Sequence, residues 1–363
     1  MNALVGPKPL ALVVVAALVV LVALGATRPT LAVAEVPGEV ARAPATLAET
    51  GLFASGLELA PGVRPFAPQY PLWTDGAHKR RWIALPPGAT IDVSDPDRWE
   101  LPVGTRLWKE FAFDGRKVET RFIWRVDATR WLFATYLWNE AQDAAALAPE
   151  DGMRGMAPLG SGRAHDVPGL DDCEACHRTG PNVVLGFGAL QLSDDRDPMA
   201  PHAESLTPDM ITLRTLVEEE LVSPHRPEWI DAPPRIMGRT PRERAALGYL
   251  AANCGGCHDA RGALAHVGLD LAHASAAPPG EPPRGLATTV DAPGRWLVPG
   301  VPPEGSRVVA PGDPARSALY QRMRSRRPLS QMPPLGTALP DAEALALIQA
   351  WITHDLAPAP KSP

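Results

Sequence analysis

The sequence has no excess of positive charge, no internal repeat and only four cysteines. Its 363 residues include 35 Lys and Arg against 41 Asp and Glu, which argues against a protein built mainly to bind nucleic acid. No repeat occurs at a solenoid period. Proline (42) and glycine (31) are abundant instead, so neither a helical bundle nor a coiled coil fits the whole chain. The composition, 45% hydrophobic and 21% charged, is that of a globular protein, and the length suggests two or three domains.

Residues 1–34 have the pattern of an export signal. Lys8 precedes an uncharged apolar run, and Ala32-Val33-Ala34 offers a small-x-small cleavage site. The alternative is an uncleaved anchor, for which an apolar run of about 17 residues is at the lower limit of a membrane span. No cysteine lies near the site, which excludes a lipoprotein anchor. We therefore expect a periplasmic or secreted protein whose residues 35–60 form a linker.

The four cysteines form two pairs, each followed directly by histidine. They read Cys173-Glu174-Ala175-Cys176-His177 and Cys254-Gly255-Gly256-Cys257-His258. C-x-x-C-H is the attachment sequence for c-type haem, in which both thiols add to the porphyrin and the histidine binds the iron. Redox disulfides, or one zinc held by four thiolates, are the alternatives. Two matches that use every cysteine favour two covalent c-type haems, with His177 and His258 as iron ligands.

Around the second pair, residues 239–356 predict a small haem domain. Thr240-Pro241-Arg242-Glu243 is a capping box that opens a helix over 241–252, directly before Cys254. A second helix is expected after Asp341. Gly248 is costly inside a helix, and we expect it to allow the two helices to cross closely, with Trp351 packed over the gap.

Between these helices lies Gln331-Met332-Pro333-Pro334. The prolines fix an extended loop, which suits a thioether held against an iron, and Met332 is the predicted sixth ligand of the second haem. The alternative is a methionine that fills a gap in the core. Four arginines precede this loop: Arg322, Arg324, Arg326 and Arg327. They could hold haem propionates or form a docking rim for an acidic partner, and the alternative is that they end a solvated helix.

On these motifs, residues 240–356 resemble a class I cytochrome c. More of the chain, about residues 60–356, is similar to a family of secreted bacterial di-haem c-type cytochromes. The stretches that carry this resemblance are Pro71-Leu72-Trp73-Thr74-Asp75, Pro102-Val103-Gly104-Thr105, Glu119-Thr120-Arg121, Tyr136-Leu137-Trp138-Asn139-Glu140 and Arg244-Ala245-Ala246-Leu247-Gly248-Tyr249-Leu250. The resemblance implies two haems and electron transfer, but no defined substrate.

The first haem region, residues 151–238, departs from the cytochrome c pattern. The segments 160–163 and 167–169 predict a loop before Cys173, a helix is expected from about Pro208, and no Met-Pro-Pro follows. Met199 and His202, in a proline-stiffened loop, are the favoured sixth ligands. Others stay open: His165, Met210, His225 and Met237. An iron with two protein ligands passes electrons, whereas an open position binds peroxide or another small ligand.

Residues 61–150 contain seven tryptophans and predict an antiparallel β module. Strands are expected at 81–85, 90–93, 105–113, 116–126 and 131–138, with a tight hairpin at Asp114-Gly115. Together they form a meander, within a small sandwich or jelly-roll-like module. Apolar residues from Val118 to Val126 alternate with a polar face: Lys117, Glu119, Arg121 and Arg125. The tryptophans are expected in the core rather than in a ligand platform, and His78 on the surface.

Together these features predict a multidomain α+β protein: the β module, then a mainly α, loop-rich di-haem cytochrome c region, and a tail at 357–363. The leading hypothesis is a periplasmic di-haem electron carrier that exchanges electrons with redox partner proteins, with no nucleic-acid partner and with peripheral membrane association as a further expectation. The first alternative is a di-haem peroxidase or oxidase with an open first haem. The second makes the β module a binding domain that delivers the cytochrome to a partner.

Overall fold

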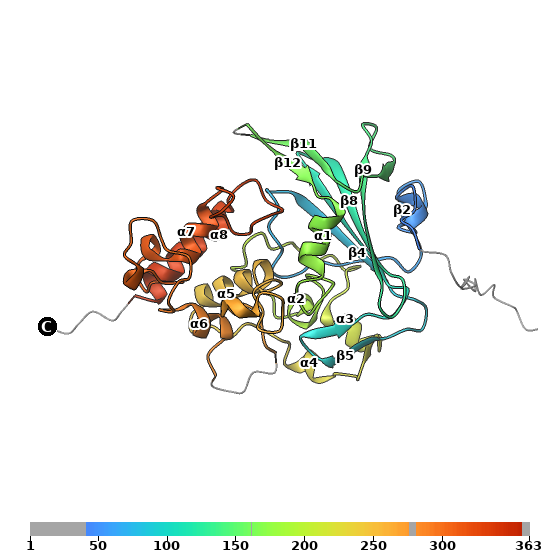
Figure 1. The fold of residues 1–363 in the computed structure, drawn as a ribbon. Helices are drawn as coiled ribbons and strands as arrows, with labels where there is room; N and C mark the ends of the chain where they lie inside the picture. The colour runs from blue at the N-terminus through green and yellow to red at the C-terminus, as the bar shows by residue number, and fades with distance from the viewer. Residues whose placement is uncertain (1–40, 161, 276–280, 358–363) are drawn as a thin grey trace, which may run out of the picture. The chain divides into compact units, whose positions relative to one another are not determined.

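The computed structural model describes residues 41–160, 162–275 and 281–357 (Figure 1), so the predicted export signal lies outside the described residues. The strands are β1 (Phe53–Ser55), β2 (Glu58–Leu59), β3 (Arg64–Pro65), β4 (His78–Ala84), β5 (Ile91–Asp95), β6 (Arg98–Glu100), β7 (Arg106–Phe113), β8 (Arg116–Arg125), β9 (Trp131–Trp138), β10 (Ala145–Leu147), β11 (Met153–Gly160), β12 (Arg163–Val167) and β13 (Val222–Ser223). The α-helices are α1 (Leu170–His177), α2 (Ala189–Leu192), α3 (Leu213–Glu218), α4 (Glu228–Asp231), α5 (Pro241–Asn253), α6 (Arg284–Thr289), α7 (Ala318–Arg324) and α8 (Ala342–Ala350). The protein is thus mixed α and β, with a β-rich part before α1.

The largest sheet has six antiparallel strands in the order β10-β9-β8-β7-β4-β3. The predicted meander of β7, β8 and β9 is confirmed, and Asp114 and Gly115 both have positive φ, as a tight hairpin between β7 and β8 requires. Smaller sheets accompany it: β1-β2, β11-β12 and β13-β5-β6. In the last of these, β13 pairs with β5 in parallel, which joins the region after α1 to the β module.

The two faces of the large sheet are both covered. On one face Trp82, Trp108 and Phe122 are buried in a cluster with Leu47 and Leu52, as the tryptophan-rich pattern predicts. The opposite face is the one predicted to be polar, yet Glu119 on it is fully buried. Helix α1 contacts β9 on this side, and β12 lies over it through a hydrogen bond to β8. Lys117, predicted on the same face as Glu119, lies instead over Trp138 on the tryptophan face, because the register between β7 and β8 shifts beside it.

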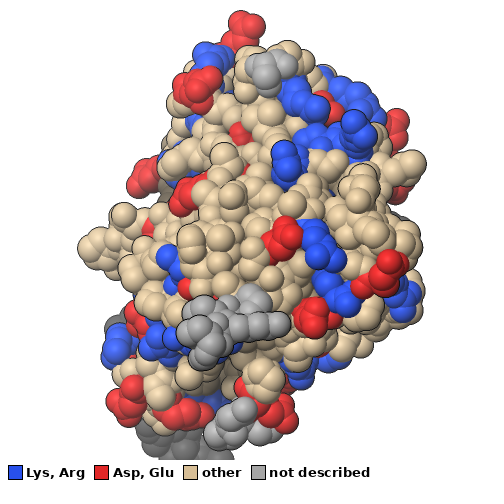
Figure 2. Space-filling view, turned by 90° about the vertical axis from the view of Figure 1, so that its left-hand side faces the viewer, with Lys and Arg blue, Asp and Glu red and all other residues tan. Residues whose placement is uncertain are grey.

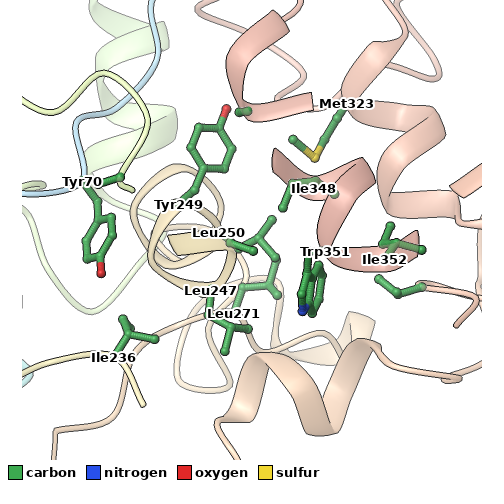
Figure 3. Close-up of a cluster of buried hydrophobic side chains, with 14 of the residues drawn as sticks. Tyr70, Ile236, Leu247, Tyr249, Leu250, Leu271, Met323, Ile348, Trp351 and Ile352 are labelled. Carbon is green, nitrogen blue, oxygen red and sulfur yellow. The ribbon is translucent and has the colours of Figure 1, made fainter. Parts of the chain in front are cut away.

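The helices after residue 240 enclose a second core. Helix α5 begins as predicted, because the Thr240 hydroxyl accepts a hydrogen bond from the Glu243 backbone N–H at 3.0 Å. Asp341 caps α8 in the same way. Figure 3 shows the buried side chains of this core, which come from these helices and from segments that pack on them: Tyr70, Ile236, Leu247, Tyr249, Leu250, Leu271, Met323, Ile348, Trp351 and Ile352.

The reason for Gly248 differs from the one expected. A Cβ at this position would overlap the ring of Tyr70, a residue of the β module, and the space is not one over which Trp351 packs. Tyr70 is 2% exposed and donates a hydrogen bond to Asp197 at 2.9 Å. The glycine therefore lets the β module, rather than a second helix, approach α5.

Residues from Ala41 onward form one compact unit. A specific contact joins the β module to the segment before α8. The Asp75 carboxylate accepts hydrogen bonds from the backbone N–H groups of Ala338 and Leu339 at 2.7 and 2.8 Å. The predicted domain limits within this unit stay predictions. Over the described ranges, no helix combines the length and hydropathy that crossing a membrane requires.

Candidate functional site

The first Cys-x-x-Cys-His pair lies on α1. The helix begins only three residues before Cys173, and β11 and β12 form a hairpin where a loop is expected. The Nδ1–H of His177 donates a hydrogen bond to the Val183 carbonyl at 2.6 Å, which leaves Nε2 as the free nitrogen of the ring. Burial lowers the pKa of His177 to about 4, so the imidazole is neutral at pH 7. A neutral imidazole oriented by a backbone carbonyl is what an iron ligand requires.

A cavity of about 590 Å³ opens beside His177. Phe133 packs against the imidazole with ring centroids 5.3 Å apart. The aromatic side chains of its wall come from the β module and from the segment after the helix: Trp99, Trp131, Phe133 and Phe187. Its volume lies within the range of cofactor sites, and its lining is mixed apolar and polar.

The second pair follows α5 directly, with Cys254 as its C-cap. The His258 backbone N–H donates to the Cys254 carbonyl at 2.8 Å, and the His258 carbonyl accepts from the Leu271 N–H at 2.8 Å. Burial, with the nearby Arg322 charge, lowers the pKa of His258. Its Nδ1 is buried and has no hydrogen-bond partner among the described residues. The His258 imidazole is therefore neutral at pH 7, and its Nδ1 makes no hydrogen bond with another described residue.

The Met332 loop is held by α7. The Met332 backbone N–H donates to the Arg322 carbonyl at 3.0 Å, and the Arg322 guanidinium donates to the Ser330 carbonyl at 3.1 Å. Since the charge of Arg322 also acts on His258, this arginine lies near both the loop and the second pair.

The four arginines before the loop divide in two. Arg322 and Arg326 are half-buried and donate to backbone carbonyls, whereas Arg324 and Arg327 lie nearer the solvent. On the face drawn in Figure 2, basic and acidic side chains are interspersed over a largely uncharged surface, with basic ones gathered near its top. The docking-rim hypothesis therefore rests on two of the four residues.

The two pairs lie side by side. The Thr179 hydroxyl, two residues after His177, is 3.9 Å from the Cys257 sulfur, and the Ala263 N–H donates to the Thr179 carbonyl at 2.9 Å. A Cβ on Gly180 would overlap the Gly256 carbonyl oxygen. Sequence spacing alone carried no sign of this contact.

All four cysteines are unpaired thiols. Burial raises the pKa of Cys176 to about 11 and that of Cys254 to about 12. Within the described part of the chain, no three His, Cys, Asp or Glu side chains converge in the way that a zinc site requires. Four free thiols beside two neutral histidines fit the donor set for two covalent haems.

Met199 and His202, the favoured sixth ligands of the first haem, lie in different surroundings. Met199 is 43% exposed. The His202 ring packs at a tilt against Trp73, and its nitrogens contact two carboxylates, Asp341 at 2.9 Å and Glu343 at 3.1 Å. Both assignments stay predictions, and in this structure the His202 nitrogens are already engaged.

Two groups were missed by sequence reasoning. His273 lines a cavity with Gly255 and Gly256, and its Nε2 is buried without a partner among the described residues. Its position 15 residues after His258, between Ala272 and Ala274, was the available signal. The second group consists of Lys79, Arg81 and Lys109, which the sheet brings to the face that α1 covers.

Comparison of the chain with protein-family models, with curated proteins and with solved structures gives no match in any of the three.

Proposed function

We propose that this protein is an exported di-haem c-type cytochrome that transfers electrons. Cys173 and Cys176 would attach the first haem, and Cys254 and Cys257 the second. The iron ligands would be His177 in the first site and, in the second, His258 and Met332: three side chains in all. Each haem, when bound, supplies a one-electron iron couple whose potential depends on the axial ligands and on burial.

The observation that carries this proposal is the contact between the two Cys-x-x-Cys-His segments. Thr179 contacts Cys257, and Gly180 packs on Gly256. Two redox groups attached to neighbouring segments of one chain exchange electrons without a diffusional encounter. This arrangement suits a protein that accepts an electron at one site and delivers it from the other to a redox partner.

The protein's own residues would orient the ligands. Val183 fixes the His177 tautomer through its carbonyl, and the α7 carbonyl of Arg322 holds the backbone of Met332. The Met332 thioether would hold the second iron together with His258, and such a ligand would raise the reduction potential, which favours electron transfer over oxygen chemistry.

The test is to produce the chain in a host competent in cytochrome maturation. We expect an intact mass with two haems and a low-spin spectrum that changes on reduction. The variants Cys173→Ala/Cys176→Ala and Cys254→Ala/Cys257→Ala should each lose one haem, which assigns the spectra. A colourless protein, or a mass without haem, would overturn the proposal.

A second candidate, a di-haem peroxidase or oxidase, is favoured by one observation. The His202 ring nitrogens are bound to Asp341 and Glu343, so this predicted ligand is not free to close the first iron in this arrangement. A high-spin ferric signal from half of the haem, shifted by cyanide or peroxide, would support this candidate. A fully low-spin spectrum that does not respond would remove it.

A further inference from the structure

Three cations form one row on the buried face of the large sheet. Arg81 on β4 pairs with Lys109 on β7, and Lys109 pairs with Arg121 on β8. Directly paired residues project from the same face, so these side chains are neighbours. Lys79, two residues before Arg81 on β4, projects from the same face.

This face is the one that α1 covers. The next row along the strands contains Ile123 and Phe133, directly paired between β8 and β9, and the Phe133 ring packs on His177. Adjacent rows on one face are about 7 Å apart along a strand. The charges of Lys109 and Arg121 also act on the pKa of His177, and that of Arg121 acts on both Cys173 and Cys176. The row therefore lies next to the first attachment site.

Of the four cations Lys79, Arg81, Lys109 and Arg121, only the two arginines are paired with a carboxylate that the structure describes. Arg81 donates two hydrogen bonds to Glu204, and Arg121 donates two to Glu119. Neither Lys79 nor Lys109 has an ion pair or side-chain hydrogen bond with another described residue, although Lys79 is only 7% exposed.

Hydrogen-bond donors outnumber acceptors in this cluster among the described residues. One terminal nitrogen of Arg81 is buried without an acceptor among the described residues, and Arg81 as a whole is 5% exposed. Burial, together with the neighbouring cations, lowers the pKa of Lys109 well below its usual value and that of Lys79 to about 8. Like charges in register repel one another, and a buried charge is stabilised by a partner, so an anion would stabilise the charged form of this cluster.

We propose that Lys79, Arg81 and Lys109 form a carboxylate-binding site of the β module, next to the first Cys-x-x-Cys-His segment. Two unpaired ammonium groups match two carboxylates in charge, and the Arg81 guanidinium supplies a further donor. The carboxylates have two sources: the two propionates of the first haem, or a free dicarboxylate bound by the same three side chains. The first source rests on the proposed function, whereas the second does not.

The experiment compares the full-length protein with Lys79→Met, Lys109→Met and the double variant. The control is Lys117→Met, which removes an ammonium from β8 that lies over Trp138, 3.5 Å from the ring centroid and on the opposite face of the sheet. Haem content is measured by intact mass, propionate hydrogen bonding by the propionate bending bands in resonance Raman spectra, and free carboxylate binding by calorimetric titration with malonate.

If the propionates fill the site, the double variant keeps both haems and its propionate bands shift, the control keeps the bands of the unmodified protein, and malonate does not bind. If a free dicarboxylate fills it, malonate binds and its affinity falls at least tenfold in the double variant. Unchanged bands together with unchanged or absent malonate binding would overturn the site. If the double variant does not fold, the same bands and malonate affinity are measured for the single variants, with Lys109→Arg as the control that keeps the charge.

The two proposals fail separately. Absence of haem in the unmodified protein overturns the cytochrome proposal, and the malonate titration then decides the carboxylate site alone.

Discussion

The hydroxyl of Thr179 lies 3.9 Å from the sulfur of Cys257, which places the end of the first Cys-x-x-Cys-His segment against the second. The adjacent Gly180 packs on the Gly256 carbonyl oxygen so closely that no side chain fits between them. The approach of the two segments therefore depends on glycine at this position.

Gly180→Ala should force the two segments apart. Overpacking of this kind costs about 1–3 kcal/mol, and we expect a corresponding decrease in the free energy of unfolding, measured with denaturant. Gly188→Ala is the matched control, because a Cβ at Gly188 meets no atom within 4 Å. Equal stability of the two variants would contradict the close approach. In the haem-loaded protein, Gly180→Ala should also slow electron exchange between the two sites.

Met332→Ala tests the second iron site. Loss of the thioether should lower the reduction potential of one haem, on the order of a hundred millivolts within the roughly 0.8 V range that axial ligands span. The haem content should stay at two, because the attachment cysteines are untouched. Met237→Ala is the control, since Met237 is 67% exposed. Redox titration with optical detection measures both, and an unchanged potential in Met332→Ala would show that this residue is not a ligand.

His165 should make stability depend on pH. Its ring is buried, which disfavours the charge, but hydrogen bonds to Asp75 (3.4 Å) and Glu119 (2.9 Å) outweigh burial and raise its pKa above 6.5. A raised pKa in the folded state means that the protonated ring stabilises the fold fully below pH 6.5. This stability is lost as the pH rises through the folded-state pKa. Each tenfold difference in proton affinity between the folded and unfolded protein is equivalent to about 1.4 kcal/mol.

The measurement is the free energy of unfolding from pH 5.5 to 9 for the unmodified protein and for His165→Gln. The difference between the two should shrink as the pH rises. A His165→Gln difference that is constant over this range would contradict the charged ring.

Gly248→Ala should destabilise the protein, although alanine is favoured over glycine in a helix interior by about 1 kcal/mol. The reason is the Tyr70 ring, which occupies the space of the new methyl group. In a Tyr70→Leu background the same change should cost less, so the double-mutant cycle should give a coupling energy of about 0.5–3 kcal/mol. Additive effects would mean that Tyr70 and Gly248 do not share this space.

Much of the local structure follows from the sequence. The strands β7, β8 and β9 and their Asp114-Gly115 hairpin follow from the alternation of residues and from turn chemistry, and α5 follows from its capping box. These are interactions between residues a few positions apart, and sequence patterns record them directly. The hairpin before α1 was missed, because its glycines are equally typical of a loop.

The site is known from the sequence only in part. The Cys-x-x-Cys-His segments identify the thiols and the histidines, because haem attachment fixes their spacing along the chain. The alternation on β8 predicts a polar face, and on that face Glu119 is fully buried and Arg121 lies beside the first pair. Alternation shows that two faces differ, but not which neighbour covers each face.

The order of amino acids is thus sufficient to identify the reactive groups and the secondary structure that presents them, since both depend on short-range spacing. It does not reveal that Thr179 meets Cys257, that Tyr70 fills the space over Gly248, or that Lys109 joins Arg81 beside α1. These contacts join segments far apart in the chain. They arise from the packing of whole elements in three dimensions, for which no local pattern exists.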